Sequence, residues 1–142
     1  MSRPPWRLLL SVLGLAVSAY LVATHYFADQ VPLACGSGGI VDCQQVTTSA
    51  EAFIGPVPVA VLGLLWFLGF LAIELARGAQ PRSRLAMLQV YWTGAGLVFV
   101  FYLVYAELFL IGAICAWCTV VHAIVAILFL VSVYDATAPA PA

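Results

Sequence analysis

The sequence predicts an all-α integral membrane protein, a bundle of four transmembrane helices with an extracytoplasmic loop that contains a short interfacial helix. Hydrophobic residues make up 65% of the 142 residues, and charged residues only 8%. A soluble domain of this size has too little polar sequence to cover so much apolar surface. The apolar residues fall in four long segments, and all the arginines lie outside them. The length fits a single domain over residues 1–142.

The four apolar segments run over about residues 8–28, 57–76, 85–110 and 111–134. Each is close to or longer than the roughly 20 residues that a helix needs to cross a bilayer. The third and fourth together are too long for one span, which predicts a turn at residues 107–112 with Gly112 as its hinge. The first follows two arginines, as a secretory signal does. It is longer than a signal's apolar core and no cleavage site of small residues follows, so we predict a retained anchor.

The basic residues predict the orientation of the bundle. All five are arginines in the N-terminal tail or in the loop between the second and third segments: Arg3, Arg7, Arg77, Arg82 and Arg84. The positive-inside rule then places the N-terminus, this loop and the C-terminus in the cytoplasm. The predicted location is multi-pass in the plasma (inner) membrane, with residues 29–56 as an outer loop. A net charge of −1 does not favour a nucleic acid partner.

Short sequence motifs predict the local structure of the loops and of the tail. The glycines around Cys35 predict a mobile stretch of the outer loop. Asp42 can open a short helix that lies on the membrane and starts with Cys43. Residues 55–58, Gly-Pro-Val-Pro, begin the second span, because proline is tolerated in a first helical turn. The tail over residues 136–142 alternates alanine and proline, which predicts disorder.

The four cysteines all fall on the outer side in this topology. Cys35 and Cys43 lie in the outer loop, and Cys115 and Cys118 lie at the start of the fourth span. Thiols three residues apart share one helix face, and Cys-x-x-Cys is the spacing used for reversible dithiol chemistry. The partial positive charge at a helix N-terminus stabilises the thiolate that attacks disulfides. Cys115, nearer the surface, suits exchange with a protein disulfide, and Cys118, one turn deeper, suits the membrane side.

Two other interpretations of the cysteines are open. An even number of cysteines on an oxidising surface fits two structural disulfides. Against this, a Cys-x-x-Cys disulfide closes a very small loop and so gives little entropic stabilisation. A zinc site needs two close pairs, whereas seven residues separate Cys35 from Cys43. We therefore predict no metal.

An ordered set of short motifs carries a resemblance to a known family. It comprises Ser18-Ala19-Tyr20-Leu21, Cys35-x7-Cys43, Ser49, Gly55-Pro56-Val57-Pro58, Leu62-Gly63 and Cys115-Ala116-Trp117-Cys118. With these motifs the chain resembles the vitamin K epoxide reductase family, in particular its compact prokaryotic members. The other four-helix family of quinone-linked thiol oxidases is similar in architecture but carries its Cys-x-x-Cys between the first two spans. Here that pair comes last.

The resemblance implies a four-helix bundle around a pocket for a quinone of the menaquinone, ubiquinone or vitamin K type. Cys115 and Cys118 would form the active-site disulfide, with Cys118 next to the quinone. Cys43 would attack Cys115, and Cys35 would exchange with a partner. Ser49 would help to position the ring or the loop. Because no thioredoxin-like domain is fused to this chain, the resemblance implies a separate extracytoplasmic thioredoxin-like (DsbA-like) protein as partner.

Two positions depart from the animal members of that family. They carry a tyrosine where this chain has His122, and an asparagine where this chain has apolar residues around Val59. His122 lies one turn below Cys118 and can donate to a quinone carbonyl or stabilise the Cys118 thiolate. The alternative is a hydrogen bond between helices. His122, Ser49 and Val59 are thus the candidate quinone-binding residues.

The predicted function is a membrane thiol:quinone oxidoreductase that supports disulfide formation in exported proteins. The alternatives are a vitamin K quinone or epoxide reductase that uses thiols as reductant, and a non-enzymatic membrane scaffold with structural disulfides.

Overall fold

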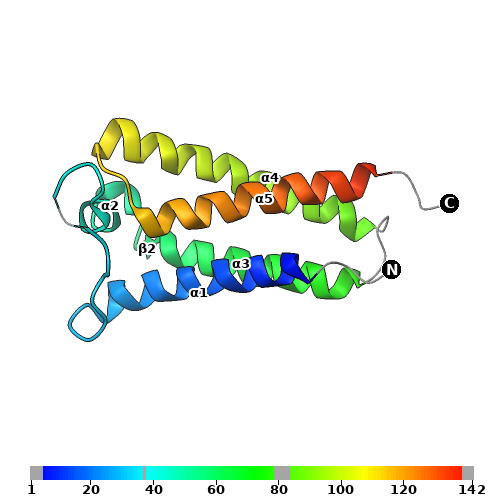
Figure 1. The fold of residues 1–142 in the computed structure, drawn as a ribbon, viewed down its shortest axis with the longest axis horizontal. Coiled ribbons are helices and arrows are strands. Elements are labelled where there is room, and N and C mark those ends of the chain that lie inside the picture. The colour runs from blue at the N-terminus through cyan, green and yellow to red at the C-terminus, as the bar shows by residue number, and fades with distance from the viewer. Residues whose placement is uncertain (1–4, 37, 79–83, 139–142) are drawn as a thin grey trace.

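A computed structural model describes residues 5–36, 38–78 and 84–138 of the chain. In this part, four long helices lie side by side (Figure 1). They are α1 (Trp6–Tyr26), α3 (Val59–Arg77), α4 (Arg84–Tyr105) and α5 (Ala116–Thr137), and the π-helical turn η2 (Ala106–Ile111) continues α4. Each is long and apolar enough to cross a membrane. The predicted all-α four-helix bundle is confirmed.

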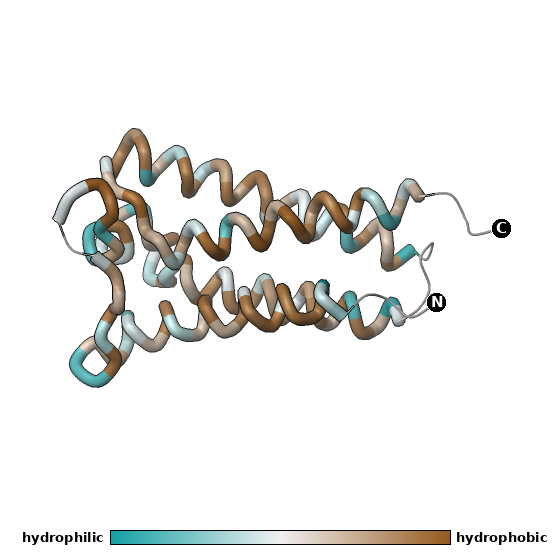
Figure 2. Tube along the Cα trace, viewed as in Figure 1, coloured by the Kyte–Doolittle hydropathy of each residue, from teal (hydrophilic) through white to brown (hydrophobic). Residues whose placement is uncertain are grey.

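Hydrophobic residues run along all four helices, and hydrophilic residues gather towards both ends of the bundle (Figure 2). The core lies between the helices and is built from large apolar side chains. Phe67 and Phe70 of α3 and Leu128 of α5 are fully buried there. Many other large apolar side chains face outward along the helices, as expected of helices that lie in lipid.

Small residues and paired tryptophans hold the helices together. A Cβ atom at Gly14 of α1 would lie 2.2 Å from the ring of Phe67, so only glycine allows α1 and α3 to approach this closely. Trp66 of α3 and Trp92 of α4 each donate their indole N–H to the other's backbone carbonyl, at 3.2 and 3.1 Å. These bonds satisfy half-buried indoles and join α3 to α4.

A buried cluster of charged groups lies at the end of the bundle where both termini emerge (Figure 1), which we call the arginine end. Arg7 of α1 donates to Asp135 of α5 and lies 3.5 Å from Glu74 of α3. Arg77 donates to Gln89 at 2.5 Å and lies 3.5 Å from Asp135. Opposite charges therefore pair across the helices, as buried charges must. Two arginines used in the orientation argument, Arg3 and Arg82, lie outside the described residues.

The segment between α1 and α3 covers the opposite end, which we call the cysteine end. It contains α2 (Cys43–Thr47), the 3₁₀ turn η1 (Ala50–Ala52) and a hairpin of β1 (Phe53–Ile54) and β2 (Val57–Pro58). The short helix after Asp42 was predicted, but the hairpin was not. Antiparallel pairing of β1 with β2 makes residues 57–58 a strand, so the second long helix begins at Val59 and not at residue 57.

The last helix also begins later than the predicted residue 111. Gly112, with φ 73°, ends η2, and an extended stretch follows before α5 begins at Ala116. Ile114 in that stretch pairs with Val41 of the outer loop as a parallel bridge. At its other end, α5 continues through Thr137 into the predicted tail of residues 136–142, of which residues 139–142 lie outside the described residues.

Candidate redox site

Cys115 is the N-cap of α5. Its backbone is extended, and its sulfur accepts a hydrogen bond from the backbone N–H of Cys118 at 3.2 Å. Thr119 adds a second contact to this first turn, because its hydroxyl donates to the Cys115 carbonyl at 2.9 Å. The two thiols of the motif therefore lie in the opening turn of the helix, where the helix dipole favours a thiolate.

A short backbone bridge brings the two cysteine pairs together. Ile114 donates its N–H to the Ile40 carbonyl at 2.8 Å, and Asp42 donates its N–H to the Ile114 carbonyl at 3.1 Å. Ile114 directly precedes Cys115, and Asp42 directly precedes Cys43. Pairing these neighbours places Cys43 against Cys115, although the two lie far apart in the sequence.

Asp42 also positions Cys43 through its side chain. Its carboxylate accepts the backbone N–H of Gln45 at 2.9 Å, which caps α2, and the N–H of Gly38 at 3.1 Å. These hydrogen bonds, first that from Gln45, hold the pKa of the Asp42 carboxyl below its usual value. The cap thus ties the glycine-rich stretch to the helix that begins with Cys43.

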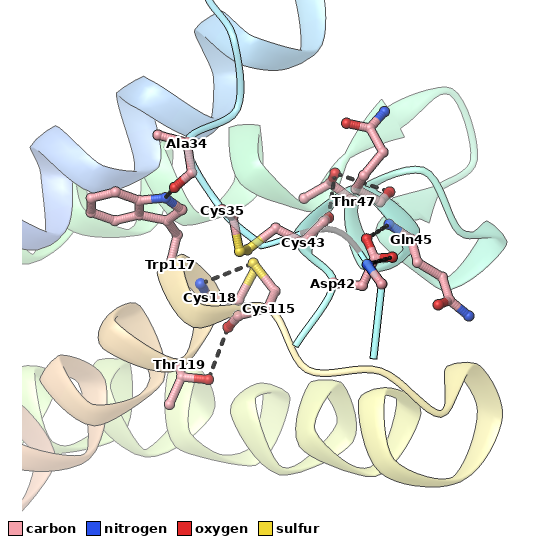
Figure 3. Close-up of a disulfide and its surroundings, with 12 residues drawn as sticks. Ala34, Cys35, Asp42, Cys43, Gln45, Thr47, Cys115, Trp117, Cys118 and Thr119 are labelled. Carbon is pink, nitrogen blue, oxygen red and sulfur yellow. Dashed lines mark hydrogen bonds between the residues drawn. A yellow bond between two sulfur atoms is a disulfide. The ribbon is translucent and has the colours of Figure 1, made fainter. Parts of the chain in front are cut away.

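Cys35 and Cys43 form a disulfide, with their Cα atoms 5.8 Å apart, and Cys115 and Cys118 are thiols. The sulfur of Cys115 points at this disulfide (Figure 3). Cys43 and Cys115 have no exposed surface and share one buried cluster, against which Cys35 and Cys118 pack. A hydrogen bond from the Cys118 side chain is the main cause that lowers the pKa of the Cys115 thiol, and it opposes the effect of burial.

A cavity of about 350 Å³ lies between the long helices, under α2 and η1. Cys118 lines it, and so do the three candidate quinone-binding residues Ser49, Val59 and His122. Aromatic and aliphatic side chains, among them Trp66, make up most of the wall. The structure therefore brings together every residue that the sequence analysis nominated for the quinone, and the role of each stays a prediction.

Glu107, which is not among the candidate residues from the sequence, also lines the cavity. Glu107 is buried on η2, and its backbone carbonyl accepts the N–H groups of Gly112 and Ala113. The π-helical turn places this carboxyl inside the bundle. A π-helical turn often marks a functional site but has no clear sequence signature. Within the described ranges, no three His, Cys, Asp or Glu side chains group as a metal site.

The fold and this site define a class of protein. Four membrane-length helices, a disulfide against a buried thiol, and a second thiol on an apolar cavity are the parts of a membrane thiol–disulfide oxidoreductase. The model of the vitamin K epoxide reductase family matches residues 5–133, and the chain belongs to that family. This confirms the resemblance found in the motifs, and membership of the family implies an oxidoreductase.

Proposed function

We propose that the protein passes electrons from an extracytoplasmic thioredoxin-like protein through its two cysteine pairs to a membrane quinone, and so supports disulfide formation in exported proteins. The observation that carries this proposal is the order of the four cysteines from the protein surface to the cavity. Cys35 is partly exposed, Cys43 and Cys115 are buried together, and Cys118 lines the cavity. Electrons that enter at the surface would therefore meet each sulfur in turn.

Each transfer is a thiolate attack on a disulfide. A partner thiolate attacks the Cys35 sulfur, which breaks the Cys35–Cys43 bond and releases the Cys43 thiolate. The partner's second thiol then attacks its own mixed disulfide and releases Cys35. Next, the Cys43 thiolate attacks Cys115 of the oxidised Cys115–Cys118 pair and releases Cys118. The Cys35 thiolate then attacks Cys43 of the resulting Cys43–Cys115 mixed disulfide, which forms the Cys35–Cys43 bond and releases the Cys115 thiolate. The present structure, with Cys35–Cys43 bonded and both other thiols reduced, fits the state after this last step.

The reduced Cys115–Cys118 pair then reduces the quinone. Oxidation of two thiols to the Cys115–Cys118 disulfide yields two electrons and two protons, which convert a quinone to a quinol. The cavity volume lies in the range of small-molecule sites, and its apolar wall suits a quinone ring. His122 would donate a hydrogen bond to a ring carbonyl, Ser49 would position the ring or the loop, and Val59 would pack against it. Glu107 and His122 are ionisable groups on this wall that can carry the protons.

Quinone reduction by the purified protein in lipid nanodiscs tests this proposal. A reduced thioredoxin-like protein and dithiothreitol serve as alternative donors, and each cysteine is changed to alanine in turn. Loss of Cys115 or Cys118 should abolish turnover with both donors. Loss of Cys35 or Cys43 should abolish it only with the protein donor, because dithiothreitol can reach the second pair directly.

Two further outcomes would favour one of the two alternative functions. Turnover of vitamin K epoxide would identify an epoxide reductase at the same site. If no quinone is consumed with either donor and the alanine variants only unfold more readily, the disulfides are structural and the proposal is wrong.

A further inference from the structure

Two aromatic side chains hold the backbone just before Cys35. The Tyr20 hydroxyl of α1 donates to the Pro32 carbonyl at 2.9 Å and accepts the N–H of Ala34 at 2.8 Å. The Trp117 indole of α5 donates to the Ala34 carbonyl at 2.9 Å. Both backbone groups of Ala34 are thus satisfied by side chains from two different long helices.

The two rings also contact each other. Their centroids lie 5.3 Å apart at an interplanar angle of 64°, an edge-to-face arrangement. Trp117 stands between Cys115 and Cys118 in the motif, and Cys35 follows Ala34 directly. Figure 3 shows the indole reaching Ala34 beside the disulfide. Trp117 and Ala34 therefore connect the Cys-x-x-Cys turn of α5 to Cys35 in the outer loop.

We propose that Tyr20 and Trp117 form a clamp that keeps Cys35 within reach of Cys43 while the two cysteine pairs exchange. This deepens the proposed function, on which it rests. After Cys43 has attacked Cys115, the Cys43–Cys115 mixed disulfide must be resolved. The Cys35 thiolate attacks Cys43, the Cys35–Cys43 bond forms, the Cys43–Cys115 bond breaks, and the electron pair leaves on Cys115.

The loop needs such a clamp because its glycine-rich backbone does little to restrict the position of Cys35. Gly36 follows Cys35, and Gly38 and Gly39 have φ values of 90° and 97°, in the region that favours glycine. Once the Cys35–Cys43 disulfide opens, Cys43 stays in α2, but Cys35 is held mainly through the Pro32–Ala34 segment. The clamp bonds lie on an exposed rim, so their loss should move Cys35 without unfolding the bundle.

The test follows disulfide exchange within the protein, without quinone. Fully oxidised protein is given one equivalent of a reduced thioredoxin-like protein, which enters at Cys35–Cys43, and thiols are trapped by acid quench and alkylation at successive times. In Tyr20→Phe and Trp117→Phe, which each keep an aromatic ring at the position but remove the hydrogen-bonding group, we expect resolution to slow by about three- to tenfold, the factor expected from losing a hydrogen bond. The Cys43–Cys115 mixed disulfide should accumulate. Tyr26→Phe, at the exposed end of the same helix, is the matched control.

Three readouts separate the clamp from a purely structural role. The KM for quinone and the turnover with dithiothreitol should match the parent protein, as should the unfolding midpoint. The double variant should slow exchange less than the product of the two single effects, because both residues hold Ala34. Unchanged exchange rates in both single variants would overturn the clamp. Failure of the proposed function would appear separately, as absence of dithiothreitol-driven quinone turnover in the parent protein.

Discussion

The backbone N–H of Cys118 donates to the sulfur of Cys115 across 3.2 Å, so the first thiol of the motif is also the N-cap of α5. Serine, threonine, aspartate or asparagine usually fills this position and accepts the same bond through oxygen. Here the capping atom is the sulfur that we propose as the reacting atom. The contacts that start the helix therefore also stabilise the Cys115 thiolate.

Replacing Cys118 should weaken Cys115 as a nucleophile at moderate pH. The Cys118 side chain is the main cause of the lowered Cys115 pKa, so Cys118→Ala should raise that pKa towards its ordinary value. A thiol with a lowered pKa is ionised from a lower pH upwards, so the onset of reactivity should move to higher pH in the variant. The measurement is the alkylation rate of Cys115 against pH with Cys35 and Cys43 changed to serine. Cys118→Ser, which keeps a hydroxyl donor, should shift less, and identical profiles would contradict the assignment.

Acid should loosen the turn that holds Cys43. Because the Asp42 pKa is lowered in the folded protein, its capping contribution is complete above the unfolded value of about 3.9 and disappears as the pH falls through the lower folded value. Hydrogen exchange of the Gln45 amide should therefore speed up as the pH drops below about 4, beyond the intrinsic pH effect. Asp42→Asn keeps a capping oxygen that does not titrate. It should abolish this added dependence, and persistence of the dependence would exclude Asp42 as its source.

The contact of Gly14 with Phe67 should make α1 intolerant of even a methyl group. A Cβ at Gly14 would lie 2.2 Å from the Phe67 ring, whereas one at Gly94 would meet Phe129 at an ordinary 3.5 Å. We expect Gly14→Ala to destabilise the protein by about 1–3 kcal/mol through overpacking. Gly94→Ala is the matched control and should be neutral or slightly stabilising, because alanine favours helices. Unfolding in mixed micelles measures both, and equal effects would refute the packing argument.

Removing Arg7 should be among the most damaging changes at the arginine end. Arg7 is 2% exposed and lies between Glu74 and Asp135. Arg7→Met would leave buried carboxylates without this partner, a change that costs about 3–5 kcal/mol in comparable buried pairs. Arg84→Met, at an exposed position of α4, serves as the control and should change stability little. A fully stable Arg7→Met variant would show that the cluster is dispensable for folding.

The helices were predictable because their signal is local. Hydropathy summed over about 20 residues identifies a span without knowledge of its neighbours. The boundaries at Val59 and Ala116 were not predictable in this way. They depend on the β1–β2 hairpin and on the bridge between Val41 and Ile114, and such pairings require the rest of the fold to be in place.

The class of fold and the family could be predicted from the amino-acid sequence alone, and so could the candidate redox cysteines. Four apolar segments predict a membrane bundle, and the spacing and order of the four cysteines match the resemblance to this family. These features depend on composition and on short-range spacing, which can be read without knowing the fold.

Which residues each sulfur contacts could not be predicted from the sequence and depends on the packing of the whole fold. Burial of Cys43 against Cys115, exposure of Cys118 to the cavity, the inward position of Glu107 and the hold of Tyr20 and Trp117 on Ala34 all join distant segments. Hydrophobic periodicity assigns a side chain to a helix face, but it does not say what lies opposite that face. That depends on how the helices and the loop over them pack, which is a property of the whole chain.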